Sequence, residues 1–503
     1  MPEMIKADVI IVGGGATGCG IARDLALRGI SHCLVEKGDF ASGATGACHG
    51  LLHSGGRYVV NDPEAAAECI AENMILRKIG QKCVERTGGL FVRLPGDSRN
   101  FRDRFLRSCD TVGIETEVLS ASRALDLVPT LNPSIEEAIK VPDCSIDPFR
   151  LCMLNIVTSQ KKGGTVLIHH KVRDIIREKG RCVGIRVQED ATDTVTEIRG
   201  KIIINAAGAW GDSVAKLAGN SVPMTLSKGS LVVTNHRLTN MVINRLRPPS
   251  DGDIIVPNEA VCLAGTTSIP VLDPDTLEIE SREVDIVATE AEKMIPAFGT
   301  TRLIRTYAGV RPLLKADGAN GRTISRGFRI IDHHDGMYSI MGGKLTTYRL
   351  MAEKMSDAVI RHFGMKTKCR TAEIPLEGQD QLSGYPLSKR LKKLENILCE
   401  CELVSREDVE RVVATVGTRH IGDIQHRTRL GMGPCQGGFC TYRALGVIQE
   451  SGRIGPDESM KMLKEFLQRR FKGIRPALWG DQLREEQLVE SIYLGILAME
   501  CEE

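Results

Sequence analysis

Short apolar runs alternate with amphipathic stretches over the first 220 residues of this 503-residue chain. Residues 7–12, Ala-Asp-Val-Ile-Ile-Val, predict a buried parallel strand, and a helix is expected directly after it. Residues 32–36 and 201–207 predict two more strands of the same kind. Strands that alternate with helices indicate an α/β fold built on a parallel sheet.

The pattern changes after residue 220. Residues 221–329 are rich in strand-like runs, which suggests a substrate domain carried by a discontinuous nucleotide-binding domain. Residues 376–390 are polar and interrupted by glycine and proline, so they predict a linker. Near the C-terminus, residues 458–471 place Met460, Leu463, Phe466 and Leu467 at helical spacing, and residues 484–499 repeat the pattern.

Composition narrows the class of protein. The 66 basic and 64 acidic residues nearly cancel, so no general attraction to nucleic acid is expected. No stretch approaches the length of an apolar membrane span, and the first strand begins too early for a cleaved signal sequence. Sixteen scattered cysteines argue for a reducing compartment. We therefore expect a cytoplasmic or peripheral protein.

Four cysteines form two tight pairs in the last quarter of the chain. Cys399 and Cys401 make a CxC motif, and Cys435 and Cys440 make a Cx4C motif among small residues. Four thiolates with glycines that let backbone N–H groups approach sulfide favour a 2Fe-2S cluster. Structural zinc also takes four cysteines, but usually as CxxC pairs, and buried unliganded thiols are a third interpretation.

A glycine motif at the N-terminus indicates dinucleotide binding. Gly13 permits the tight turn after the first strand, Gly15 lets a pyrophosphate approach the helix N-terminus, and Gly18 lets the helix close on the sheet. Glu36 ends the second strand, where a carboxylate meets an adenosine ribose. A GxGxxG alone is a weak signal, but strand, glycines, helix and acid together are specific.

Three further segments extend this interpretation. Residues 40–46 form a small-residue loop able to wrap the cofactor, although an ordinary turn has the same composition. The strand at 201–207 breaks at Gly208, beneath the expected cofactor. Gly342 and Gly343 stand at a predicted helix start, a place that binds anionic groups.

Together with the N-terminal glycines, three motifs resemble the FAD-dependent glycerol-3-phosphate dehydrogenase family: His53-Ser-Gly-Gly-Arg-Tyr58, Tyr307-Ala-Gly-Val-Arg-Pro312 and Gly342-Gly-Lys-Leu-Thr-Thr-Tyr348. The cysteine segment is similar to bacterioferritin-associated ferredoxin, as in the large subunits of the anaerobic, multi-subunit branch. The resemblance implies a Rossmann-type FAD-binding domain of the glycine oxidase and D-amino-acid oxidase kind, an antiparallel substrate domain and a mainly helical iron-sulfur region. The expected boundaries are 1–375 for the oxidoreductase domain (FAD-binding parts 1–90, 140–220 and 330–370; substrate part 221–329), 376–390 for the linker, 391–445 for the 2Fe-2S domain and 446–503 for the helical end.

The resemblance also implies roles for individual residues. A glycerol phosphate is a dianion, and Arg57 and Arg311 lie in motifs that the family uses for its phosphate, with Tyr58 and Arg326 as further substrate contacts. Lys344 is placed to stabilise negative charge on the reduced flavin. The implied FAD contacts are Gly13, Gly15, Gly18, Glu36, Lys37, Ser42, Thr45, Gly46, His49, Val172, Ala207, Gly208, Gly342, Gly343, Leu345 and Thr346.

Oxidation of a secondary alcohol also needs a proton acceptor, and a histidine suits that role. His53, His49 and His236 are the candidates. The resemblance implies that single-subunit members of the family have a histidine directly after Lys-Gly-Ser. In this chain Lys228-Gly-Ser230 is followed by Leu231, so the sequence leaves the choice of proton acceptor open.

The function implied is oxidation of sn-glycerol 3-phosphate to dihydroxyacetone phosphate. Electrons would pass through the cluster to partner electron-transfer subunits and indirectly to quinone, at the cytoplasmic face of the inner membrane. One alternative is a flavoprotein that acts on a 2-hydroxy acid or an amino acid, and another is a redox-sensing scaffold without a substrate pocket. Binding of FMN as a second flavin stays open.

Overall fold

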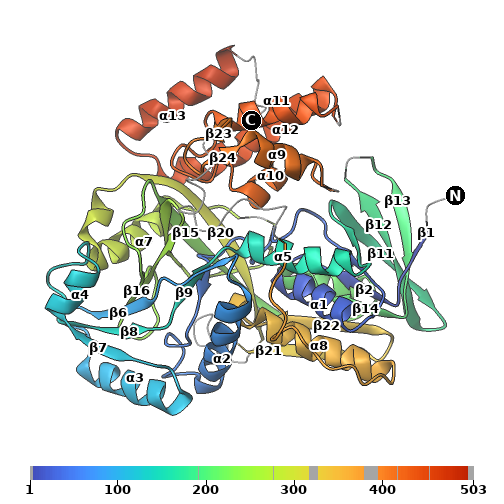
Figure 1. Cartoon of the computed structure of the whole chain (residues 1–503), viewed down its shortest axis with the longest axis horizontal. Coiled ribbons are helices and arrows are strands. Elements are labelled where there is room, and N and C mark those ends of the chain that lie inside the picture. Colours follow the sequence, from blue (N-terminus) through green and yellow to red (C-terminus); the bar gives the residue numbers. More distant parts are fainter. Residues whose placement is uncertain are drawn as a thin grey trace.

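The computed structural model describes residues 4–190, 192–275, 277–315, 327–378, 395–415, 417–452 and 454–496. Arg326 and most of the expected linker lie outside these residues. Within them the chain forms two large sheets with covering helices, and a C-terminal helical layer packs across both (Figure 1).

A six-stranded sheet forms the nucleotide-binding part. Its strand order is β10 (Thr165–Leu167), β3 (His32–Val35), β2 (Val9–Val12), β14 (Ile202–Asn205), β22 (Met337–Gly342) and β21 (Phe328–Asp332). All pairs are parallel except β21 with β22. The parallel sheet expected from the apolar runs is therefore confirmed.

The two faces of β2 bury into different neighbours, as the alternation of a strand requires. Val9 and Ile11 pack with the helices α1 (Ala16–Leu27), α5 (Pro148–Lys161) and α8 (Tyr348–His362). Ile10 and Val12 pack with a second, four-stranded sheet. That sheet has the order β1 (Met4–Lys6), β13 (Val195–Arg199), β12 (Arg181–Glu189) and β11 (His170–Glu178).

The substrate part is a nine-stranded sheet that is antiparallel except where β16 pairs with β6. Its order is β19 (Ile269–Val271), β15 (Met224–Thr234), β18 (Val261–Gly265), β17 (Ile254–Asn258), β16 (Val242–Arg245), β6 (Gly89–Arg93), β8 (Glu137–Val141) and β7 (Glu117–Ser120), with β20 (Leu303–Leu314) paired to β15. Residues 89–141 thus add three strands to a sheet that the sequence placed in 221–329 alone.

Helices cover both faces of the substrate sheet. Leu90 and Val92 face a core shared with α4 (Ala121–Leu127) and α7 (Ser281–Met294), whereas Phe91 faces α2 (Pro63–Ile79) and α3 (Arg99–Val112). The remaining short elements in this half are β4 (Leu51–Leu52), β5 (Val84–Glu85), β9 (Cys144–Ile146), α6 (Gly211–Lys216), η1 (Gly208–Trp210), η2 (Pro296–Gly299) and η3 (Leu345–Thr347).

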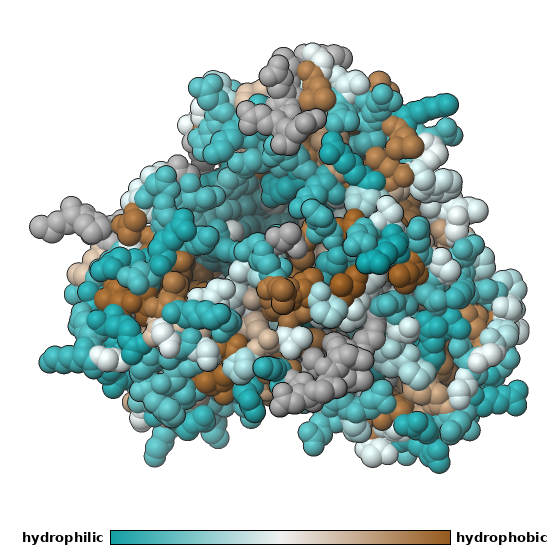
Figure 2. Space-filling model, turned by 180° about the vertical axis from the view of Figure 1, so that it is seen from behind, coloured by the Kyte–Doolittle hydropathy of each residue, from teal (hydrophilic) through white to brown (hydrophobic). Residues whose placement is uncertain are grey.

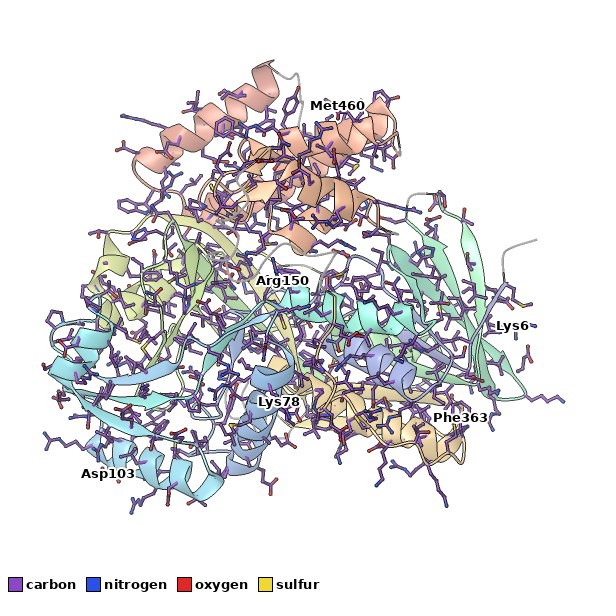
Figure 3. The ribbon with its side chains drawn as sticks, viewed as in Figure 1. Lys6, Lys78, Asp103, Arg150, Phe363 and Met460 are labelled. Atoms are coloured by element: carbon purple, nitrogen blue, oxygen red, sulfur yellow. The ribbon has the colours of Figure 1, made fainter. Side chains whose placement is uncertain are left out.

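The C-terminal layer has a core of its own. It contains β23 (Ile397–Cys399), β24 (Val404–Ser405), α9 (Arg406–Val413), α10 (Ile421–Thr428), α11 (Cys440–Glu450), α12 (Pro456–Ile474), η5 (Arg475–Ala477), α13 (Asp481–Ser491) and the π-helical turn Ile492–Ile496. Both predicted C-terminal helices are present. In the first, Leu463, Phe466 and Leu467 are buried as expected, but Met460 is 41% exposed at the outer edge of the layer (Figure 3), and Met462 is buried instead.

Buried ion pairs and ring contacts fix this layer to the oxidoreductase part. Asp39 accepts from both Arg427 nitrogens at 2.9 and 3.0 Å, and the ring of His426 stacks on Phe149 of α5. Arg150, on the same helix, lies in the middle of the molecule below the C-terminal layer (Figure 3). Separating a buried ion pair leaves an uncompensated charge, which is strongly destabilising. These contacts therefore hold the C-terminal layer and the oxidoreductase part in one arrangement.

The outer surface is mainly hydrophilic. Figure 2 shows polar residues over most of one face, with hydrophobic residues gathered in patches across its middle. No helix in the described part of the chain is long and apolar enough to cross a lipid bilayer.

Candidate active site and cysteine cluster

One cavity of about 1210 Å³ runs between the two large sheets. Most of the sequence-predicted site residues line it: Gly13, Gly15, Glu36, Lys37, Ser42, Thr45, His49, His53, Arg57, Tyr58, Val172, Ala207, Gly208, Arg311, Gly342, Gly343, Lys344 and Leu345. Gly18, Gly46 and Thr346, also predicted as cofactor contacts, are not among its lining residues. His236 is exposed on the turn after β15 and does not line the cavity, and Arg326 lies outside the described residues.

The glycine turn leaves room that side chains would fill. Gly13 has φ +115°, and a Cβ there would lie 2.5 Å from the carbonyl oxygen of Ala206. A Cβ on Gly18 would lie 1.9 Å from the carbonyl oxygen of Gly13, so the helix can approach the turn only with glycine at this position. The turn feeds α1, whose N-cap Gly15 brings no capping side chain, which leaves the helix N-terminus open for an anion.

Glu36 organises the backbone beside this turn. Its carboxylate accepts from the N–H of Gly14 at 2.6 Å and of Gly38 at 2.9 Å, and from the hydroxyl of Ser42 at 3.2 Å. Thr45 Oγ1 accepts from the N–H of Ala16 at 3.1 Å. These contacts hold the predicted ribose and pyrophosphate sites in one corner of the cavity, an arrangement that fits a dinucleotide.

Trp210 and Asp275 also line this end, although no sequence motif marks them. Lys37 Nζ lies 3.7 Å from the centre of the Trp210 ring, and both residues donate to Asp275 Oδ1, at 3.2 and 2.9 Å. The stacking of Lys37 on Trp210 is a cation–π contact between residues far apart in the sequence. Local sequence therefore could not reveal it.

Gly342 and Gly343 precede Lys344 on the central wall. Both glycines have positive φ, +79° and +76°, so the chain turns sharply between β22 and η3. Lys344 Nζ lies 5.5 Å from the Tyr58 ring, and Thr346 Oγ1 accepts from the N–H of His53 at 3.1 Å. The lysine expected beside the flavin is thus adjacent to the predicted substrate residues.

Two arginines line the cavity from different segments of the chain. Arg57 donates to the carbonyl of Ser250 at 3.2 Å and pairs with Asp253 at 3.3 Å. Arg311, on β20, donates to the carbonyl of Thr267 at 3.2 Å and to the hydroxyl of Thr266. Both guanidinium groups therefore have fixed positions, which is what binding of a phosphate dianion requires.

The histidines differ in their surroundings. His53 is buried, with its ring centre 5.3 Å from that of Tyr58 and 6.1 Å from that of His49. Burial and the charges of Arg57 and Arg311 lower the pKa of His49 to about 3, and its Nδ1 is buried without a hydrogen-bond partner. His49 is therefore neutral at physiological pH and presents an unused ring nitrogen in the cavity wall.

The four predicted cysteine ligands come together in the C-terminal layer. The side chain of Cys440 contacts those of Cys399 and Cys435, and Cys401 contacts Cys435. Within the described ranges, no group of three or more ligand side chains surrounds a single metal position. These contacts join the four thiols into one continuous group, and four thiolates are the ligand number of a 2Fe-2S cluster or a structural zinc.

Backbone N–H groups point at these sulfurs. Contacts from Cys401 and Cys440, together with the N–H groups of Gly437 and Gly438, lower the pKa of Cys435 to about 2. A Cβ on Gly433 would lie 2.5 Å from Cys401 Cβ, so only glycine leaves this approach open. These donors favour the thiolate at Cys435, the form that ligates iron, while the pKa of the donating thiols Cys401 and Cys440 is raised by the same contacts.

Comparison with known proteins agrees with this geometry. Residues 8–353 match the family model FAD dependent oxidoreductase, and residues 397–450 match the model BFD-like 2Fe-2S binding domain. The chain is 41% identical to a subunit of the anaerobic glycerol-3-phosphate dehydrogenase of Escherichia coli K12, over 99% of this chain and 98% of that protein. The chain belongs to the anaerobic glycerol-3-phosphate dehydrogenase family. The corresponding subunit of the Haloferax volcanii enzyme is 39% identical over 97% of this chain and 90% of its own length.

Membership confirms the expected resemblance and the two cofactors, FAD and a 2Fe-2S cluster. Solved structures show the same fold. The glycerol-3-phosphate dehydrogenase of Bacillus halodurans, complexed with FAD, has a TM-score of 0.66 at 22% identity and covers 94% of this chain and 96% of that one. Glycine oxidase of Geobacillus kaustophilus has a TM-score of 0.59 at 19% identity, over 75% and 99%. The implied fold class is confirmed.

Proposed function

We propose that this protein oxidises sn-glycerol 3-phosphate to dihydroxyacetone phosphate. The observation that carries the proposal is that Arg57 and Arg311 line the same cavity as the glycine turn and Glu36, an arrangement that fits a dinucleotide. Removal of two electrons and two protons converts the secondary alcohol to the ketone. Bound FAD supplies the two-electron acceptor.

Arg57 and Arg311 bind the phosphate and fix the glycerol carbons in the cavity. Tyr58 lies beside Lys344, whose ammonium favours negative charge on the reduced flavin. We assign the hydroxyl proton to His53, because it is buried among Tyr58, His49 and Thr346 at the centre of the site. His236 is not part of this proposal, since it lies outside the cavity.

The residues that hold FAD in this proposal are those that line the nucleotide end. Gly13, Gly15 and Ala16 offer the turn and helix N-terminus to the pyrophosphate, and Glu36 faces the ribose. Cys399, Cys401, Cys435 and Cys440 hold the cluster. The relatives are named as subunits, and a cluster delivers single electrons, so this chain would pass electrons to partner subunits and the quinone pool at the cytoplasmic face of the inner membrane.

Anaerobic absorption spectra of the purified holoenzyme test the function. Glycerol 3-phosphate should bleach the flavin, whereas glycerol and 2-hydroxy acids at the same concentration should not. Arg311→Ala should weaken substrate binding by about 10- to 150-fold, which corresponds to loss of a charge-assisted contact of about 1.5 to 3 kcal/mol. Arg302→Gln is the matched control, because Arg302 pairs with Glu485 away from this cavity. Equal bleaching by glycerol would disprove the phosphate assignment.

A further inference from the structure

Arg305 reaches from the substrate sheet to the cysteine segment. Its Nη1 lies 3.4 Å from Oε1 of Gln436, the residue directly after Cys435. Its guanidinium rests on Gly473 of α12, where a Cβ would come within 3.0 Å of Arg305 Cζ. The neighbouring Thr306 donates to the carbonyl of Gly473 at 3.0 Å. Strand β20 and helix α12 therefore hold Arg305 beside the cysteine loop.

The loop residue that meets Arg305 is itself fixed. Gln436 is 4% exposed and has φ +50°, and its Nε2 donates to the carbonyls of Met432 and Gly433 at 3.2 and 3.0 Å. Its own carbonyl accepts from Arg470 at 3.1 Å. Because the amide nitrogen is used inward, the amide oxygen must face Arg305.

The charge of Arg305 differs from the other cations near the cysteines. Arg470 forms a buried ion pair with Glu486, and Arg443 pairs with Glu400 at 2.6 Å. No carboxylate within the described ranges forms an ion pair with Arg305. Burial, with Arg469 and Arg470 nearby, lowers its pKa to about 10, so it is still charged at neutral pH. A partly buried charge is screened less by solvent and salt than an exposed ion pair.

The same face of β20 leads to the flavin cavity. Residues at alternate positions of a strand share a face, so Arg305, Tyr307 and Arg311 point the same way. The Tyr307 hydroxyl donates to the carbonyl of Cys48 at 2.9 Å, and Cys48 and Arg311 both line the cavity. One strand thus contacts the cysteine loop at one end and the substrate site at the other.

We propose that Arg305 sets the reduction potential of the iron-sulfur cluster, as a partly buried cation held against Gln436, the residue directly after the ligand Cys435. A cluster gains one negative charge on reduction, so a nearby cation stabilises the reduced form and raises the potential. The higher potential makes the cluster a better acceptor of electrons from the flavin. The inference rests on the ligand set proposed above.

Redox titration of the full-length holoenzyme, followed by the electron paramagnetic resonance of the cluster, tests the role. Arg305→Gln should make reduction of the cluster about tenfold less favourable, a fall of about 59 mV for one electron. Arg305→Lys should keep the wild-type potential, because it keeps the charge. Arg484→Gln is the control, since Arg484 lies on α13, is 88% exposed and pairs with Asp481. Its potential should be unchanged.

An intact cluster signal with an unchanged potential in Arg305→Gln would overturn the inference. An equal shift in Arg305→Lys would also overturn it, because packing rather than charge would then be responsible. If Arg305→Gln does not fold, Arg305→Met keeps an unbranched stem over Gly473 and gives the same comparison. A wild-type holoenzyme without a cluster signal would instead refute the ligand set, so the two failures are distinguishable.

Discussion

The guanidinium of Arg311 lies directly over Gly229 on the neighbouring strand. A Cβ at position 229 would come within 2.2 Å of Arg311 Nη2. On its other side, Arg311 is held by the hydroxyl of Thr266 and the carbonyl of Thr267. The cation is therefore confined between β15 and the segment after β18, and its place in the cavity depends on the absence of a side chain at 229.

Gly229→Ala should displace the Arg311 guanidinium and weaken binding of glycerol 3-phosphate by about tenfold or more, the effect of a lost charge-assisted contact. Substrate titration of flavin reduction measures this change. The FAD content should stay that of the wild type. Gly446→Ala is the control, because a Cβ at 446 meets no atom within 4 Å. Unaltered affinity in Gly229→Ala would show that Arg311 does not bind the phosphate.

His49 should make the protein less stable in mild acid. Its folded-state pKa is about 3, lowered by burial and by Arg57 and Arg311, against about 6.5 in the unfolded chain. Between these two pH values the His49 ring is protonated in the unfolded chain and neutral in the folded protein. Stability is therefore lost as the pH falls through this window, by at most about 1.4 kcal/mol per pH unit for one proton.

The denaturation midpoints of wild type and His49→Gln between pH 4.5 and 7 measure this contribution. His49→Gln should lose less stability than the wild type as the pH falls, because glutamine does not titrate. His334→Gln is the control, since the His334 side chain is 87% exposed. Parallel curves for wild type and His49→Gln would disprove the assignment.

Sequence alone predicted the elements whose signals are local. The run Val9–Val12 and its glycine turn give both the central strand and the cofactor corner, because burial on both faces and the tight turn each require particular residues. The cysteine spacing likewise identified the four thiols that the fold brings together. Each of these features is encoded within about ten neighbouring residues or in one repeated residue type.

Features that depend on distant contacts could not be predicted this way. Strands β6 to β8 join the substrate sheet through β16, a pairing between residues about 150 positions apart. His236 follows β15 in sequence, but the chain leaves the sheet where β15 ends, and the His236 side chain is exposed to solvent. Met460 fits a helical stripe, but the core lies on the side of Met462, because periodicity fixes the spacing of a stripe and not its exact rotation.

Docking of the C-terminal layer should depend on the ionisation of His169. Its Nε2 lies 3.1 Å from Asp423 of α10. Burial opposes the charged ring, but the hydrogen bond and charge of Asp423 raise the pKa of His169 above its usual value. The contribution of this pair is therefore full below about pH 6.5 and is lost as the pH rises through the higher folded-state pKa.

Hydrogen exchange of α10 measures this docking. Exchange should rise, beyond its intrinsic pH dependence, between neutral and mildly alkaline pH in the wild type, whereas His169→Gln should show no such added step. His170→Gln is the control, because His170 contacts the carbonyl of Ile168 and not the C-terminal layer. An identical step in His169→Gln would exclude this ion pair as the cause.

Replacement of one thiol should separate the two cofactors. Cys435 contacts both Cys401 and Cys440, so Cys435→Ser removes a central member of the proposed ligand set. The variant should contain FAD and almost no iron. Glycerol 3-phosphate should still reduce its flavin, because no residue of the Cys435 loop lines the cavity. Transfer to quinone in the presence of partner subunits and membranes should fail.

Cys369→Ser provides the matched control for this variant, since Cys369 is half-buried and its thiol contacts Thr371 rather than another cysteine. Its iron content and electron transfer should equal those of the wild type. Metal analysis of anaerobically prepared protein discriminates the remaining alternatives: two irons per chain are expected, whereas one zinc and no iron would refute the cluster. Iron retained by Cys435→Ser would mean that another side chain completes the site, and the proposed ligand set would then be wrong.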